Sequence, residues 1–534
     1  MIKVSHICFL RGRKYNLAGE RTTNSIRNLS FTIGAYGFNF LLQLMNRVLF
    51  VRFLSQEYLG LCGLFSNIML MLAIVDLGLG EAMVYKLYKP IAEKDEKRII
   101  ALMQLSTKLF RFIGGAVFLV AVSLTPFLQN IIKDMPDIPW VRAYYLLFVI
   151  ETVIPYFFCT KRFLIYCDQK VFITMVSNMA KKILTAILQI LVLYFTRNFF
   201  LFLVIQVVFT VAENFTINRI ADRIFPFIRH AAKEPLPQEE ILEIKKTVYA
   251  ATFHKVGNTV LNSSDNIIIS SLLGLNAVGI IFNYQLVVTT IQTFIVNIFT
   301  SISASVGNLT ALKDEGIDQE FVFNRILLAN YFLSMVLTSI LFIVLNPFIS
   351  LMYGEQYLLS TFALATLLGS FYLLLVRKTV MTFRDVTGLF WNDRYKSVIE
   401  CVLNIAISIP LTLKFGIAGT FLGTIISILC VSFWVEPFIF FKHFFRKSMK
   451  KYILKQIFQI FLTIGNIMIC VAACSFITSN SILHILGKAS ISGLISIVIF
   501  SIVSGRSREF AYFYEKILAS VKLLGKKINF IGKK

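Results

Sequence analysis

The sequence predicts an all-α polytopic membrane protein with about fourteen transmembrane helices. Of the 534 residues, 57% are hydrophobic and only 15% are charged, and the mean hydropathy is +0.74. A soluble protein carries about 25% charged residues. Long apolar runs follow one another from Leu29 to Ser504. The 52 phenylalanines, set against 11 prolines and 29 acidic residues, exclude a disordered or linker-rich chain.

Each predicted span is an apolar run close to the roughly 20 residues that a helix needs to cross a bilayer. Short polar or charged segments separate the runs, and Lys488 interrupts the last of them. The predicted spans are residues 29–53, 58–80, 109–131, 141–160, 171–195, 199–220, 247–273, 277–303, 326–351, 357–380, 397–413, 417–441, 456–478 and 482–504.

The basic residues predict that both termini lie in the cytoplasm. Of the 53 Lys and Arg residues, 42 fall in alternate gaps or at the adjoining ends of the spans, beginning with the segment before the first span. The other gaps hold only Lys133, Arg197 and Lys414, and Arg142 lies next to one of them at the start of a span. Basic loops stay on the cytoplasmic side of a membrane. The net charge of +24 therefore reflects topology, and we expect no nucleic-acid partner.

The spans divide the chain into two six-helix lobes with additions at both ends. The tail has Phe510 and Phe513 at helical spacing among lysines, which predicts a helix lying on an anionic membrane face. A basic solvated tail that only enforces topology is the alternative. The predicted parts are the basic N-terminus 1–28, the N-lobe 29–222, a cytoplasmic linker 223–246, the C-lobe 247–442, an extra helix pair 443–504 and the basic amphipathic tail 505–534.

The sequence lacks the motifs by which enzymes are recognised. The eight cysteines form neither a zinc-binding nor a disulfide pattern. The five histidines are scattered, and there is no GxxxxGK[ST] phosphate loop. The loops predicted outside the membrane are too short for a soluble catalytic domain. We therefore expect a transporter rather than an enzyme, with no metal and no bound cofactor.

Two loops of the sequence resemble each other at an offset of 219 residues. The run at 54–61 matches the run at 273–280, so that Gly60 aligns with Gly279. Transporters are often built from such repeats, and their binding sites lie where the repeats meet. Applied to the preceding helices, the offset pairs Asn39 with Asn258, Gln43 with Asn262, Asn46 with Asp265, and Arg47 with Asn266.

These polar positions form stripes along the predicted helices and are our candidate substrate-binding residues. A charged side chain at mid-membrane costs about 2.5–3.5 kcal/mol on insertion scales, so it usually faces water or a partner. Interhelical hydrogen bonding, an internal pair such as Lys255 with Asp265, or snorkelling are the alternatives. The charged candidates are Arg47, Lys181, Lys182, Lys255 and Asp265, and the amides are Asn39, Gln43, Asn46, Asn258, Asn262, Asn266, Asn283 and Asn297.

A mostly cationic, amide-lined cavity between two halves suits an anionic substrate that is rich in hydroxyls. Lys and Arg hold phosphate oxygens through charge-assisted bonds, and Asn and Gln both donate to and accept from sugar hydroxyls. Asp265 is acidic, so it could bind H⁺ or Na⁺ and couple transport to an ion gradient.

Several runs between residues 24 and 445 resemble those of bacterial polysaccharide transporters. LSQEYLGL at 54–61 and DLGLG at 76–80 look like the start of such proteins, and SDNIIIS at 264–270 followed by GIIFNY at 279–284 is similar to their second half. Shorter matches follow at 307–309, 346–349, 388–396 and 416–420. The chain thus resembles the Wzx-type oligosaccharide-lipid flippases of the multidrug/oligosaccharidyl-lipid/polysaccharide exporter superfamily.

The resemblance implies two six-helix lobes in a MATE-like V shape that work by alternating access, with the extra C-terminal pair of the fourteen-helix members. It implies a substrate of undecaprenyl-pyrophosphate-linked oligosaccharide repeat units. These would be flipped across the bacterial cytoplasmic membrane for capsule, O-antigen or other surface polysaccharides. A polysaccharide polymerase and glycosyltransferases would be partners.

Three other functions stay open. A lipid II flippase of the same superfamily would also have a cationic cavity, and the stripes do not separate the two. A MATE-like drug or cation antiporter would favour an acidic, aromatic cavity, whereas the charges here lean basic. A membrane glycan polymerase or ligase would need a large extracytoplasmic loop, which the sequence does not predict.

Overall fold

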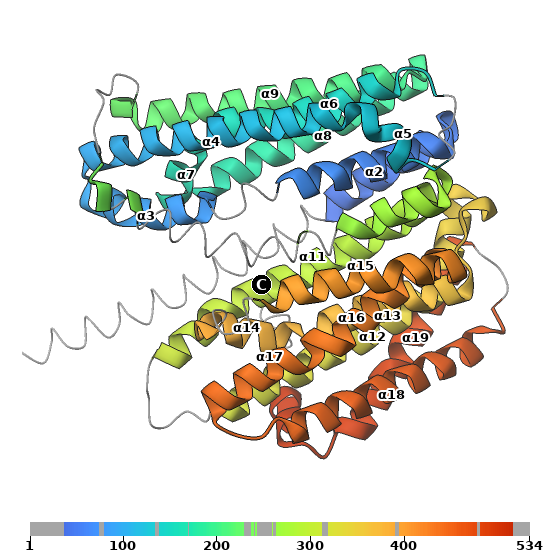
Figure 1. Cartoon of the computed structure of the whole chain (residues 1–534). Coiled ribbons are helices and arrows are strands. Elements are labelled where there is room, and N and C mark those ends of the chain that lie inside the picture. Colours follow the sequence, from blue (N-terminus) through green and yellow to red (C-terminus); the bar gives the residue numbers. More distant parts are fainter. Residues whose placement is uncertain are drawn as a thin grey trace, which may run out of the picture. The chain divides into compact units, whose positions relative to one another are not determined.

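The computed structural model of the chain is helical and contains no strand in the residues that it describes, which confirms the predicted all-α class (Figure 1). These residues are 37–73, 79–133, 138–168, 170–228, 236–239, 241–242, 259, 263–311, 319–389, 395–477 and 481–515.

Within these ranges, eleven helical stretches are long and apolar enough to cross a membrane. Their main helices are α4 (Glu96–Leu124), α6 (Val141–Phe158), α8 (Val171–Thr196), α9 (Phe199–Ile224), α11 (Leu275–Ala311), α12 (Gln319–Tyr353), α13 (Thr361–Val376), α15 (Lys396–Phe415), α16 (Ile417–Ser427), α18 (Lys450–Cys474) and α19 (Ile482–Ser504). Shorter helices are α2 (Gln56–Leu72), α3 (Leu79–Glu93), α5 (Leu128–Ile131), α7 (Thr160–Cys167), α14 (Lys378–Val386) and α17 (Phe433–Phe440).

Eleven predicted spans coincide with these eleven stretches. The predicted span 58–80 corresponds to α2, which has 17 residues and ends at Leu72. The predicted spans 29–53 and 247–273 are helical over residues 37–53 and 263–273, and the rest of each lies mainly outside the described residues. The number fourteen and the predicted linker 223–246 therefore stay predictions.

By their internal contacts the residues form two compact units. The first comprises Met1–Leu54, Met83–Gly115 and Leu147–Leu236, and the second comprises Ser55–Ala82, Ala116–Leu146 and Pro237–Lys534. The boundaries at 115 and 147 fall inside α4 and α6, so the units are not coextensive with the predicted lobes.

In the second unit, α2 and α11 cross with their backbones in close contact. A Cβ atom on Gly60 would lie 2.2 Å from the backbone oxygen of Leu275, and one on Gly279 would lie 2.7 Å from the backbone oxygen of Gln56. At the offset of 219 residues, Gly60 is equivalent to Gly279 and Gln56 to Leu275. The two contacts are therefore equivalent: Gly60 meets Leu275 in one direction, and the repeat-related residues Gly279 and Gln56 meet in the other. A local two-fold relation between the repeats requires this reciprocity, so the contact supports the repeat.

The helices α18 and α19 pack on α12 with faces that contain polar side chains as well as apolar ones. Asn466 on α18 donates to the hydroxyl of Ser339 on α12 at 2.7 Å and to that of Ser496 on α19 at 2.8 Å. The outward faces carry exposed apolar side chains such as Phe461 and Ile502. This polarity is the reverse of a soluble helix, because lipid rather than water surrounds the bundle and polar contacts hold its helices together.

The predicted tail helix is present over residues 508–515, and the remainder of the tail lies outside the described residues. Phe510 and Phe513 pack against the cluster formed by Leu328, Tyr331 and Phe500. In this part of the tail, the apolar residues that suggested membrane binding are used for packing within the second unit.

Candidate functional site

A chain of hydrogen-bonded side chains runs through the first unit. Asn46 donates to Gln189 Oε1 on α8 at 2.8 Å, and Gln189 donates to the carbonyl oxygen of Phe202 on α9 at 3.1 Å. Gln206, one turn further along α9, donates to the carboxylate of Glu151 on α6 at 2.7 Å. The chain joins four helices of the bundle, which is the hydrogen-bonding role that polar residues often take in membranes.

A second group of charges lies on the same bundle around Glu213 of α9. Arg162 of α7 donates to Glu213 Oε1 at 3.0 Å and approaches the amide oxygen of Asn214 at 3.4 Å. Lys181 Nζ of α8 lies 3.7 Å from Glu213 Oε2. The predicted site residue Lys181 is therefore held in an internal ion pair.

Lys182 lies next to this group and has a different environment. It shares one face of α8 with Met175, Gln189 and Leu193, since these positions fall within about 20° of it around the helix. Gln189 and Leu193 are buried, whereas Met175 and Lys182 are exposed. Leu191 marks the opposite, apolar face, which is exposed as expected for contact with lipid. Lys182 thus lies on the face of α8 that packs in the bundle further along the helix, and not on the face that carries Leu191.

The ammonium of Lys182 forms no hydrogen bond or ion pair with any residue that the structure describes. It lies within electrostatic range of Lys181, which repels it, and of Glu213, which attracts it. By contrast, Lys170, just before α8, pairs with Asp168 at 2.7 Å. Of the two adjacent predicted lysines of α8, Lys182 is the one whose described surroundings leave it available to an anion.

The other predicted residues of the first unit lie on the helical segment 37–53. Asn39 and Arg47 are half-buried, Gln43 is exposed, and Asn46 is turned into the bundle toward Gln189. Asn46 therefore faces the inside of the bundle, whereas the part of the stripe around Gln43 is exposed.

The structure separates the predicted residues of the second unit. Asn266 donates to Gln285 Oε1 of α11 at 3.0 Å. Asn283 is fully buried, and neither end of its amide has a hydrogen-bond partner among the described residues. Asn297, three turns and more along α11, is exposed. These amides do not form one group. The remaining predicted residues of this unit, Lys255, Asn258 and Asn262, lie outside the described residues.

Asp265 faces the polar seam between α15 and α16. Its carboxylate makes a hydrogen-bonding contact with the hydroxyl of Thr424, which also accepts from the amide of Asn404 at 3.0 Å. The other carboxylate oxygen, Oδ1, is buried and has no hydrogen-bond partner in the described ranges.

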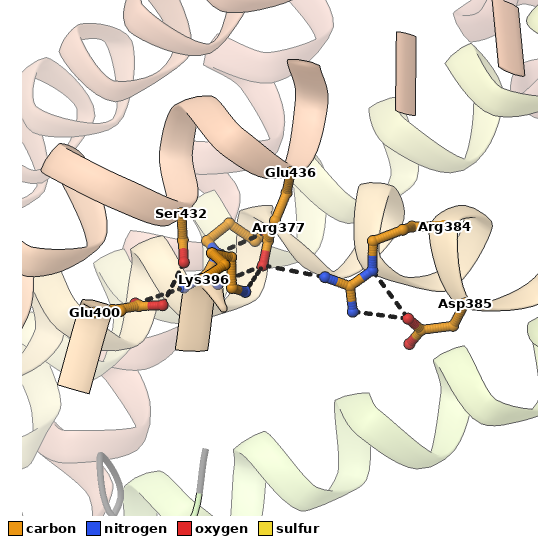
Figure 2. A network of polar contacts seen from close by, with 7 residues as sticks. All are labelled: Arg377, Arg384, Asp385, Lys396, Glu400, Ser432 and Glu436. Carbon is orange, nitrogen blue, oxygen red and sulfur yellow. Dashed lines mark hydrogen bonds and ion pairs between the residues drawn. The ribbon is translucent and has the colours of Figure 1, made fainter. Parts of the chain in front are cut away.

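The second unit also holds a network of buried charges that sequence reasoning missed (Figure 2). Figure 2 shows Glu436 of α17 in contact with three cations from α14, α15 and the break between α13 and α14. Arg377 binds both oxygens of Glu436, at 3.0 and 2.7 Å. Lys396 also bonds to Glu436, and Arg384 reaches it at 3.7 Å.

The rest of the network completes the charge balance. Glu400 lies 3.5 Å from Arg377 and accepts a hydrogen bond from Ser432. Arg384 bonds to Asp385, the exposed member, at 2.7 Å. A π-helical segment, Ile428–Ser432, precedes α17 and presents Ser432 to Glu400. Three cations face three carboxylates in these contacts, and Lys378 lies within electrostatic range of the same groups, so the charges of the network are used mainly to bind one another.

A sequence signal for this network existed in part. Glu400 and Glu436 lie inside predicted apolar spans, where an acid needs a partner. Their partners Arg384 and Lys396 fall in the cytoplasmic loop predicted after the span 357–380, and Arg377 lies at the cytoplasmic end of that span, where basic residues indicate topology. The structure instead buries these three side chains.

Comparison with solved structures relates the fold to known transporters. A lipid II flippase, MurJ, in an inward closed conformation matches with a TM-score of 0.66 at 15% identity over 89% of this chain and 99% of that one. An inward-facing multidrug resistance MATE transporter of the MOP superfamily matches with a TM-score of 0.56 at 12% identity, over 75% of this chain and 94% of that one. A MOP superfamily transporter from Pyrococcus furiosus matches with a TM-score of 0.51 at 12% identity, over 78% of this chain and 95% of that one. At these identities the likeness shows the fold alone.

The sequence comparisons are more specific about the family. No curated protein matches the chain. The family model described as polysaccharide biosynthesis protein matches residues 25–303, which is just over half of the sequence. The chain therefore belongs to the polysaccharide biosynthesis protein family, as its sequence runs indicated.

Proposed function

We propose that this protein flips undecaprenyl-pyrophosphate-linked oligosaccharide repeat units across the bacterial cytoplasmic membrane by alternating access. The transported units would feed the synthesis of capsule, O-antigen or another surface polysaccharide. A polysaccharide polymerase and glycosyltransferases would act on the same lipid-linked units.

The observation that carries this proposal is the environment of Lys182. An ammonium within the membrane that forms no ion pair or hydrogen bond with the described residues is costly unless water or an anion reaches it. A pyrophosphate supplies such an anion through charge-assisted hydrogen bonds. Gln43 and Asn39, on the open part of the stripe 37–53, add amide groups that suit sugar hydroxyls.

Family membership supports the choice of substrate class. A polysaccharide biosynthesis protein with a transporter fold and no catalytic motif is suited to moving a lipid-linked glycan rather than making it. The solved lipid II flippase of similar fold carries a lipid-linked precursor of the same general kind.

Asp265 is our proposed ion-coupling residue. Its carboxylate lies beside Thr424, whose hydroxyl oxygen is a hard ligand of the kind that Na⁺ binds and which Asn404 contacts in turn. The buried Oδ1, which has no hydrogen-bond partner among the described residues, can equally take a proton. Neutralising this carboxylate with an ion removes the cost of its burial, so ion binding would favour one conformation over another.

The test is complementation of a deletion in the source bacterium. The deletion should stop surface polymer formation and cause its lipid-linked repeat unit to accumulate. Lys182→Gln should lower polymer export by about tenfold or more, since a hydrogen bond to a charged group contributes about 1.5–3 kcal/mol. Lys170→Gln, which removes a paired lysine outside the helix, is the matched control and should export normally.

The accumulated lipid decides between the candidates. Accumulation of lipid II with cell lysis would replace our proposal with a peptidoglycan flippase. Normal export by Lys182→Gln at wild-type protein levels would remove this residue from the site.

A further inference from the structure

The two cations around Glu213 are held by contacts of unequal quality. Arg162 hydrogen-bonds to one carboxylate oxygen at 3.0 Å. Lys181 lies 3.7 Å from the other oxygen, which is too long for a hydrogen bond. Lys181 is therefore held by electrostatic attraction alone, and it is the partner that can leave while Arg162 keeps Glu213 in position.

Glu213 is less exposed than either of its cations, and the Arg162 side chain is 23% exposed. The Glu213 side chain is 4% exposed, whereas that of Lys181 is 20% exposed. Lys181 is adjacent in sequence to Lys182 and points about 100° away from it around α8, and the two ammonium groups lie within electrostatic range of each other. A lysine has a flexible four-carbon stem, so the Lys181 ammonium can turn toward Lys182 without movement of Glu213 or of the helices.

We propose that Glu213 is an internal competitor of the substrate head group. When no substrate is bound, Glu213 holds the Lys181 ammonium. When a pyrophosphate binds at Lys182, Lys181 leaves Glu213 and becomes its second cation, and it returns to Glu213 on release. This inference rests on the proposed function of Lys182 and adds a residue that controls affinity at the same site.

The physical reason for such a competitor is turnover. Two adjacent ammonium groups in a medium of low dielectric constant would bind a pyrophosphate too tightly for rapid release. A fixed carboxylate that recaptures one of them lowers the affinity of the site for the pyrophosphate. A carrier needs such an intermediate affinity, because its substrate must bind on one side of the membrane and dissociate on the other. Glu213 is thus a positioning residue that acts through Lys181.

The experiment measures binding of two lipid probes to the purified full-length protein, undecaprenyl pyrophosphate and uncharged undecaprenol. Glu213→Gln should bind undecaprenyl pyrophosphate about tenfold more tightly than wild type, because one competing charge is removed within about 4 Å of the ammonium. Its affinity for undecaprenol should not change. In transport, the same variant should lower both KM and kcat.

The matched control is Asp222→Asn. Asp222 lies further along the same helix and pairs with Lys161 at 2.5 Å, so this variant removes the same kind of charge from a pair away from Lys182. It should leave the affinity for both probes unchanged. Glu213→Asp is the second variant if the glutamine variant does not fold. It keeps a charge for Arg162 but draws the carboxylate back from Lys181, and it should give a smaller gain in affinity.

The outcomes distinguish the two proposals. A wild-type protein that binds both probes equally would overturn the proposed head-group recognition. A wild-type protein that prefers undecaprenyl pyrophosphate, together with folded Glu213 variants of unchanged affinity, would overturn the competitor role alone. A lower thermal stability without a change in affinity would make Glu213 a structural link of the bundle.

Discussion

At the scale of single residues, the charges within the membrane divide into two kinds. Lys182 forms no ion pair with any residue that the structure describes, whereas Glu436 is surrounded by Arg377, Lys396 and Arg384. A buried charge that has lost its partner is strongly destabilising. The first kind therefore suits ligand binding, and the second suits the fixing of helices.

Glu436→Gln should lower the free energy of unfolding by about 3–5 kcal/mol, because it leaves several buried cations without their shared partner. Thermal and denaturant unfolding in detergent measures the loss. Glu320→Gln is the control, since Glu320 pairs with Lys447 at an exposed position, where an ion pair contributes about 0–1 kcal/mol. Equal losses in the two variants would contradict the structural role of Glu436.

The sequence identified Lys181 and Lys182 as candidates but could not separate them. Their difference depends on Glu213, which lies on another helix, and on which side of α8 is covered. Helical periodicity gives the relative directions of side chains but not the rotation of the helix in its bundle. For the same reason, the sequence groups Asn266 with Asn283 and Asn297, from the stripes of two neighbouring predicted helices, as one set of candidates, although the structure separates them.

At the scale of elements, the repeat was visible in the sequence because two loops keep the same small residue at equivalent positions. The contact between those loops was not visible, since the offset says nothing about which helices touch. The structure supplies the reason for the glycines. The backbones of α2 and α11 approach so closely that a Cβ at either position would overlap a carbonyl oxygen.

Gly60→Ala and Gly279→Ala should each destabilise the protein by about 1–3 kcal/mol, as overpacking does in other well-packed contacts. Gly115→Ala in α4 is the control. No atom lies within 4 Å of a Cβ built there, and alanine favours a helix over glycine by about 0.8–1.0 kcal/mol. Thermal unfolding of the three variants checks the prediction, and unchanged stability of both α2 and α11 variants would argue against the tight crossing.

At the scale of the whole molecule, hydropathy predicted eleven of the observed helical stretches because lipid requires long apolar helices. It could not predict how α18 and α19 dock, since their buried faces carry polar side chains such as Asn466, which bonds to Ser339 of α12 and Ser496 of α19. Coupling to an ion gradient is also a property of the whole molecule, because an ion bound in one place must bias the complete cycle.

Asp265→Asn should abolish the stimulation of transport by an ion gradient, while protein level and binding of undecaprenyl pyrophosphate stay near wild type. The amide keeps the size of the side chain but can neither take up a proton nor neutralise Na⁺. Membrane vesicles with an imposed H⁺ or Na⁺ gradient provide the measurement, and the response to each gradient identifies the ion. Gradient-driven transport at the wild-type rate would exclude Asp265.

The reciprocal contact of Gly60 and Gly279 has an evolutionary consequence. If the halves arose by duplication of one ancestral gene segment, this crossing was once a meeting of two identical copies. Selection there acts on both descendants together, because a bulkier side chain in one copy obstructs the backbone of the other. The two segments are thus expected to stay alike at this point in distant homologues, even where the rest of the halves have diverged beyond recognition.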